Sequence, residues 1–98
     1  MAKPDVTEFG EWRSRIDALD QELITLLNLR ATCAIEIGRI KRRLGLAIYD
    51  PEREEEIFEA MLKANGGPLD PTGVRRLFER IIDESRRMER LTADKKNR

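Results

Sequence analysis

Two cations occupy a helix face whose other residues are apolar. Arg30 falls on the same face as Ile16, Leu23 and Ile37, at spacings of seven residues. An unpaired guanidinium is costly to bury, so Arg30 needs an anion or a route to solvent. Lys41 lies eleven residues further on, only about 20° around the helix and roughly 16 Å along it. Two such side chains could reach a small anion between them. The alternatives are a snorkelling or ion-paired Arg30 and a Lys41 that interacts with the helix C-terminus.

A second set of charges surrounds the proline at position 51. Asp50 can cap a helix and Pro51 suits its first position, which leaves Arg53 as a cation where the helix dipole favours anions. We expect this cap to direct Arg53 and its neighbour Glu54 towards the end of the preceding helix, near Lys41. The other acidic residues of the stretch are predicted to form a solvated face: Glu52, Glu55 and Glu56.

Two polar residues interrupt an apolar stripe near the C-terminus. Ser85 and Glu89 are four residues apart, a spacing that places them on one helix face. They are either site residues or structural ones, with Ser85 permitting close packing and Glu89 pairing with Arg86 on the surface. The remaining basic pairs are predicted to be solvated: Arg75-Arg76 and Arg86-Arg87.

Arg13 lies at the edge of the first apolar stripe, about 25 Å from Arg30 along one helix. It therefore cannot easily share a site with Arg30 of its own subunit, but in an antiparallel dimer it could reach the partner's site. Cations predominate among the polar residues at otherwise apolar positions. This pattern predicts a pocket for a multiply anionic small molecule.

Composition limits the chemistry and the partners. The chain has no His, which excludes Ser-His and Cys-His nucleophiles and most zinc or iron sites. Cys33, the single cysteine, lies on the apolar stripe and is predicted to be a buried structural thiol. Lys plus Arg and Asp plus Glu both number 19, so no overall basic field favours nucleic acid. Without a signal segment or a membrane-spanning run, we expect a soluble, cytoplasmic protein that binds no membrane.

The elements that must position these residues are three helices in a single domain, residues 1–98. We expect helices over about 7–44, 51–64 and 71–92, followed by a polar tail over 93–98. Gly45 ends the first helix, and two Asp-Pro pairs, at 50–51 and 70–71, begin the others. The apolar stripe of the first helix comprises Ile16, Leu19, Leu23, Leu26, Leu27, Cys33, Ala34, Ile37 and Ile40.

The first helix is too long for a compact chain of this size. Some 34 residues of it span about 50 Å, whereas a compact domain of this length is only about 35 Å across. Two shorter helices cannot cover the whole apolar stripe. We therefore expect an all-α fold that forms an intertwined helical homodimer.

Four segments together resemble the all-α chorismate mutase family. They are RSRIDALDQELITLLNLR, EIGRIKRR, YDPEREEEI and RLFERIIDESRRME, which cover roughly residues 13–89 in order and with suitable spacing. The resemblance implies an intertwined dimer of three-helix chains with two shared active sites. It also implies an isomerase of phenylalanine and tyrosine biosynthesis that converts chorismate to prephenate without cofactor, metal or covalent intermediate.

The resemblance also implies roles for individual residues. Arg30 and the partner subunit's Arg13 would bind the substrate carboxylates. Lys41 and Glu89 would donate hydrogen bonds to the breaking ether oxygen, and Glu89 can do so only when protonated. We therefore expect turnover to fall as rising pH removes that proton, and Glu89→Gln to extend activity to higher pH. The supporting contacts would come from Arg53 and Ser85 near the carboxylates, and from Glu54 and Asp50 at the ring hydroxyl.

Several alternatives remain open on the same residues. The nearest are an isochorismate pyruvate lyase or an amino-chorismate mutase of the same fold, although Asp50 and Glu54 favour the mutase. An alternative of another class is a non-catalytic helical module that regulates another shikimate-pathway enzyme, and a complex with such an enzyme is compatible with either reading. Nucleic-acid binding is disfavoured by the zero net charge and the scarcity of aromatic residues.

Overall fold

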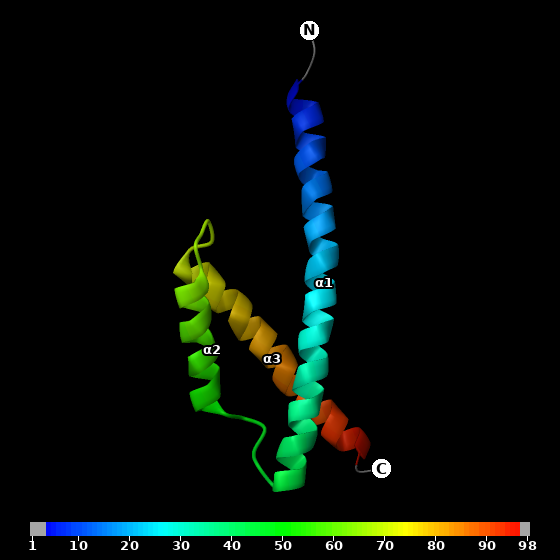
Figure 1. Ribbon diagram of the computed structural model, residues 1–98, viewed down its shortest axis with the longest axis vertical. Helices are drawn as coiled ribbons and strands as arrows, with labels where there is room; N and C mark the ends of the chain where they lie inside the picture. The colour runs from blue at the N-terminus through cyan, green and yellow to red at the C-terminus, as the bar shows by residue number, and fades with distance from the viewer. Residues whose placement is uncertain (1–3, 97–98) are drawn as a thin grey trace. The chain divides into compact units, whose positions relative to one another are not determined.

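The computed structural model describes residues 4–96, and it describes side chains from residue 6 to residue 91. This part of the chain forms three helices and no strand, α1 Pro4–Leu44, α2 Pro51–Ala64 and α3 Pro71–Lys96 (Figure 1). The predicted all-α chain with a very long first helix is therefore confirmed. Compared with the predicted ranges, α1 begins three residues earlier and α3 ends four residues later. The predicted polar tail accordingly begins inside α3, and its residues 97–98 lie outside the described part.

The chain divides into two units, Met1–Arg30 and Ala31–Arg98. The described part of the first unit is helix alone, and most of its large apolar side chains are exposed in the single chain. No helix among the described residues is both long enough and apolar enough to cross a membrane. The exposed apolar residues of this unit are Val6, Phe9, Trp12, Ile16, Leu19, Leu23, Ile24, Leu26 and Leu29.

The second unit contains the buried apolar residues. α2 packs on α3 (Figure 1), and the buried apolar residues of the unit are Phe58 on α2, Val74 and Ile82 on α3, and Ala34 on α1. The structure corrects one prediction here, because Cys33 is exposed in the single chain. Its neighbour Ala34 takes the buried position, since adjacent residues on a helix point about 100° apart. Other members of the predicted stripes are also exposed: Ile37, Ile40, Leu77 and Leu91.

A glycine cap ends α1 and directs the chain towards α2. Gly45 has a φ of 71°, a left-handed conformation that glycine adopts without steric cost. The Gly45 N–H donates to the Arg42 carbonyl at 3.2 Å, and the Leu46 N–H donates to the Lys41 carbonyl at 2.7 Å. These two bonds form a Schellman motif, so the path of the loop after α1 is fixed by its own backbone.

Asp-Pro pairs begin both other helices, as predicted. The Asp50 carboxylate accepts from the Arg53 N–H at 3.2 Å, and Pro51 occupies the first turn of α2. The Asp70 carboxylate likewise accepts from the Gly73 N–H at 2.7 Å at the start of α3. Each cap thereby fixes the residue at which its helix begins, and so the direction of the side chains in its first turn.

A close approach between α1 and α3 depends on Gly38, which is buried. A Cβ atom at this position would lie 3.0 Å from Glu89 Cα and 3.1 Å from Glu89 Cβ. Because one of these atoms belongs to the backbone, a side chain could be accommodated only if one helix shifted. The glycine therefore sets the spacing at which α3 presents Glu89 to α1.

Candidate active site

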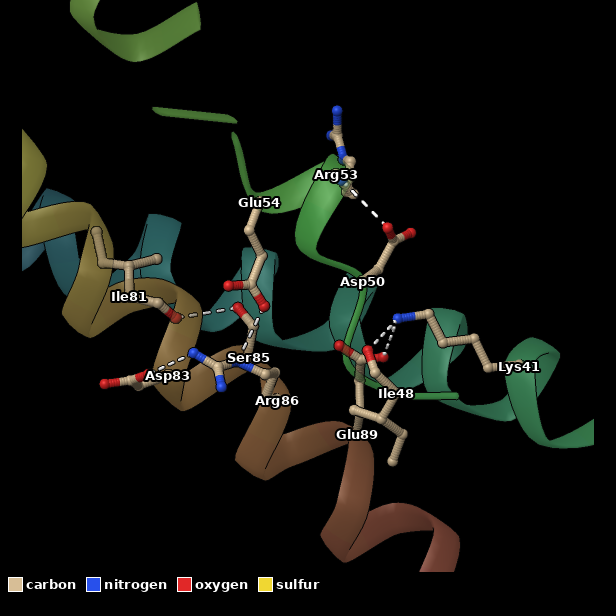
Figure 2. Close-up of polar contacts among 10 residues, drawn as sticks. All are labelled: Lys41, Ile48, Asp50, Arg53, Glu54, Ile81, Asp83, Ser85, Arg86 and Glu89. Atoms are coloured by element: carbon tan, nitrogen blue, oxygen red, sulfur yellow. Dashed lines mark hydrogen bonds and ion pairs between the residues drawn. The ribbon is translucent and has the colours of Figure 1, made fainter. Parts of the chain in front are cut away.

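The most buried charged group of the described residues is at this crossing. Lys41 Nζ lies 3.0 Å from Glu89 Oε1, and the two side chains are only 16% and 8% exposed (Figure 2). The Lys41 ammonium also donates to the Ile48 carbonyl at 2.7 Å. The loop that the Schellman motif directs thus supplies an acceptor for Lys41. An ammonium has three N–H groups, so the bond to the Ile48 carbonyl leaves donors for a ligand beside Glu89.

Glu89 is buried without full hydrogen bonding. Although its Oε1 lies 3.0 Å from Lys41 Nζ, the alignment does not make a hydrogen bond, and this oxygen finds no other partner among the described residues. Buried polar atoms in folded proteins are nearly always paired, so an exception needs an explanation, of which a catalytic role is one. Glu89 is therefore buried beside Lys41, and it is not the surface partner of Arg86 that its spacing allowed.

A second ion pair joins α2 to α3. Glu54 Oε2 lies 3.0 Å from Arg86 Nε, and the side chains are 17% and 28% exposed. Arg86 Nη2 also donates to the Asp83 carboxylate at 2.6 Å, and its guanidinium carbon lies 5.5 Å from the centroid of the Tyr49 ring. The prediction that Arg86 belongs to a solvated basic pair is therefore wrong. Its position four residues after buried Ile82 could have revealed this, because residues at that spacing share a helix face.

Arg53 does not point towards these groups. The Asp50 cap directs Glu54 inwards, but the Arg53 guanidinium extends away from the other labelled polar side chains (Figure 2). It pairs instead with Glu56 at 3.2 Å, with both side chains about two-thirds exposed. In this structure the cap does not present Arg53 and Glu54 in the same direction, because successive residues of a helix lie about 100° apart. The structure corrects that part of the sequence expectation.

The other predicted site residues differ in their surroundings. The Ser85 hydroxyl donates to the Ile81 carbonyl at 3.1 Å (Figure 2). Asp50 is exposed and serves as the α2 cap. Arg13 and Arg30 belong to the first unit, where the Arg13 guanidinium stacks 3.8 Å from the Phe9 ring centroid and Arg30 is half-buried. The roles of all these residues stay predictions.

Gly38 is the other residue that the sequence reasoning missed. The pair Ala34 and Gly38, small residues four apart and both buried, is a signal for close helix packing that could have identified it. Within the described residues, no group of three or more His, Cys, Asp or Glu side chains is placed to hold a metal ion. The candidate site thus contains two ion pairs that join helices, Lys41–Glu89 and Glu54–Arg86.

A model of the family described as chorismate mutase type II matches residues 12–90. The chain belongs to this family. The matched range includes all eight residues that the sequence predicts for the site.

Individual relatives agree with the family assignment. The chain is 42% identical over 79 residues to a bifunctional chorismate mutase/prephenate dehydratase of Aquifex aeolicus, covering 76% of this chain and 22% of that protein. A chorismate mutase of Methanocaldococcus jannaschii is 34% identical over 58 residues, which is 59% of each chain. The solved structure of a chorismate mutase (form II) from Thermus thermophilus superposes with a TM-score of 0.83 at 35% identity, covering 85% of this chain and 94% of that one. The chain spans about a fifth of the length of the bifunctional relatives, 22% and 23% for two of them.

Proposed function

We propose that this chain is a chorismate mutase, the activity that its relatives carry in their names, and that it isomerises chorismate to prephenate. The observation that carries the proposal is the Lys41–Glu89 pair, which is buried at a helix crossing with a ligand-ready donor and an oxygen that lacks a hydrogen bond. The rearrangement breaks one C–O bond and forms one C–C bond within the same molecule, so no atom or electron is gained or lost. Catalysis then requires only a selected conformer and stabilisation of the charge that develops on the ether oxygen.

Different residues of the site contact different groups of the substrate. The Lys41 ammonium and a protonated Glu89 donate to the ether oxygen, where negative charge appears in the transition state. Glu54 accepts a hydrogen bond from the ring hydroxyl, with Asp50 nearby at the start of α2. The two substrate carboxylates are held by cations and a hydroxyl, namely Arg30, Arg53, Ser85 and the partner subunit's Arg13.

A homodimer with two shared sites is part of the same proposal. The exposed apolar residues of the first unit would otherwise remain in water, and a second copy of the chain offers the same face in return. Sedimentation of the purified chain is expected to show a dimer. A complex with another enzyme of phenylalanine and tyrosine biosynthesis is compatible with the relatives that join a chorismate mutase to a prephenate dehydratase in one chain.

The direct test is turnover of chorismate by the wild-type chain and by Arg30→Ala. We expect the wild type to consume chorismate and form prephenate, and Arg30→Ala to lose most of this activity. A parallel assay with isochorismate, followed by release of pyruvate, separates the mutase from the lyase. Wild-type protein that is folded and dimeric but leaves chorismate unchanged would refute the proposed activity.

Shared sites can be tested by mixing two inactive variants. Arg13→Ala and Arg30→Ala place their lesions in opposite subunits of a shared site. In a heterodimer, both lesions can therefore fall in one site and leave the other intact. Activity should return when the subunits exchange. No recovery after verified exchange would exclude the contribution of Arg13 from the partner subunit.

A further inference from the structure

We propose that Arg86 is a positioning residue that holds the Glu54 carboxylate in the orientation needed to recognise the substrate's ring hydroxyl. The inference rests on the proposed function, because it concerns how one contact of that site is built. Arg86 itself need not touch the substrate. It acts by joining the first turn of α2 to α3 at the point where Glu54 enters the site.

Three contacts fix the guanidinium of Arg86 from different elements. Its Nε lies 3.0 Å from Glu54 Oε2 on α2, and its Nη2 donates to Asp83 on its own helix at 2.6 Å. Its guanidinium carbon lies 5.5 Å from the ring centroid of Tyr49, in the loop before α2. A side chain held in this way has few alternative rotamers. Its positive charge therefore stays in one place and holds the Glu54 carboxylate there.

Glu54 needs such a partner because its carboxylate is largely removed from water. With 17% of its side chain exposed, an ionised Glu54 without a cation would lose solvation and have no compensating interaction. A glutamate also has three rotatable bonds, and an unpaired one would order them only on binding. Arg86 faces Oε2, and we assign the other oxygen, Oε1, to the ring hydroxyl.

The ion pair lacks a well-aligned hydrogen bond, since the buried Arg86 Nε has no hydrogen-bond acceptor among the described residues. The interaction is therefore mainly an attraction between charges. A lysine at position 86 should supply part of that attraction. The neighbouring Arg87 supplies a matched control. It is 59% exposed and its guanidinium lies 3.5 Å from Glu84 of the same helix, so it shares the charge of Arg86 but faces a different direction.

The test is a double-mutant cycle of Arg86→Met and Glu54→Ala in steady-state turnover of chorismate, with Arg87→Met as the control. The ring hydroxyl is not part of the bonds that break or form, so its contact stabilises ground state and transition state alike. Loss of such a contact raises KM and leaves kcat unchanged. We expect Arg86→Met to raise KM about five- to tenfold, as for loss of one hydrogen bond. Arg86→Lys should raise KM less than Arg86→Met does, and Arg87→Met should leave KM and kcat unchanged.

Comparing Arg86→Met in the wild type and in Glu54→Ala shows whether Arg86 acts by positioning Glu54, by contacting the substrate directly or only by stabilising the fold. If Arg86 acts through Glu54, Arg86→Met should change KM less than about twofold once Glu54 is already alanine. An equal effect in both backgrounds would overturn the proposal, and so would a fall in kcat at constant KM. Should Arg86→Met fail to fold, Arg86→Lys is measured in the same two backgrounds with the same criteria. A wild type that does not turn over chorismate would refute the proposed function itself, whereas additive losses in an active enzyme would refute only the role of Arg86.

Discussion

The Lys41–Glu89 and Arg53–Glu56 pairs have nearly the same separation between charged atoms, 3.0 and 3.2 Å, but opposite surroundings. The first joins two helices and is almost completely buried. The second lies within one turn of α2, and its side chains are 64% and 66% exposed. The distance between the charged atoms therefore does not distinguish an ion pair in a candidate site from an ion pair on the surface.

The difference in burial changes what each pair costs and what it can do. A surface pair contributes about 0–1 kcal/mol and can be broken at little cost, so Arg53 is available to turn towards an anionic ligand. A buried pair must offset the desolvation of both charges, and it keeps its geometry whether or not a ligand is present. Lys41 and Glu89 are thus positioned in advance, whereas Arg53 would be recruited on binding.

The largest effect should come from breaking the buried pair. Lys41→Met removes the donor to the ether oxygen, and we expect kcat to fall about 10²–10³-fold, as for other donors to a developing oxyanion. Arg39→Met is the control on the same helix, because Arg39 is exposed and pairs with Glu36 on the surface. Circular dichroism should establish that both variants fold, since Glu89 loses its cation in the first. Near wild-type kcat in folded Lys41→Met would remove Lys41 from the mechanism.

A smaller loss is expected from Gly38→Ala, which leaves both charges in place but changes their spacing. The added Cβ would lie 3.0 Å from the Glu89 backbone, so α3 must shift relative to α1. Displacements of about 1 Å can reduce turnover by up to about 10²-fold, and we expect kcat to fall about tenfold. The matched control is Gly10→Ala, because Gly10 is also within α1 and has no atom within 4 Å of the added Cβ. Equal activity of the two variants would show that the close approach does not position Glu89.

The comparison also shows which features the sequence could predict. Local signals predicted the three helices, because Gly45 and the two Asp-Pro pairs act on their own backbone. Helical spacing correctly grouped Ser85 with Glu89 and placed Lys41 at the end of α1. The Glu54–Arg86 pair was missed because it depends on how α2 packs on α3, which no spacing within one helix specifies.

Two of the errors have a geometric cause on the helix itself. Arg53 and Glu54 were expected to point together, and Cys33 was expected to be buried with Ala34. In both cases the residues are adjacent, and adjacent side chains on a helix diverge by about 100°. Assigning each position to a face before assigning its role would have separated Arg53 from Glu54 and Cys33 from Ala34.

Arg53→Ala tests whether the exposed cation is recruited on binding. A charge-assisted hydrogen bond to a substrate carboxylate is worth about 1.5–3 kcal/mol, and turning Arg53 away from Glu56 offsets part of this, so we expect kcat/KM to fall about tenfold. The melting temperature should not change, because the pair is a surface one. Glu56→Ala is the control: it removes the same ion pair but leaves the cation, and it should keep full activity. Equal losses in both variants would mean that the pair matters for the fold rather than for the substrate.

The smallest effect at acidic pH, and the most diagnostic, is expected for Glu89→Gln. A carboxyl donates a hydrogen bond only while protonated, whereas an amide donates at every pH. If Glu89 donates to the ether oxygen as proposed, catalysis by the wild type requires its carboxyl proton and kcat should fall at pH values where that proton is absent, whereas the variant should not show this fall. At acidic pH the two should differ by only a few-fold, because both supply a donor and Lys41 keeps its bond to the Ile48 carbonyl. The measurement is kcat against pH for both proteins, with the pH dependence of the fold followed in parallel. Superimposable profiles would mean that Glu89 does not donate to the substrate and that its burial beside Lys41 serves the helix crossing alone.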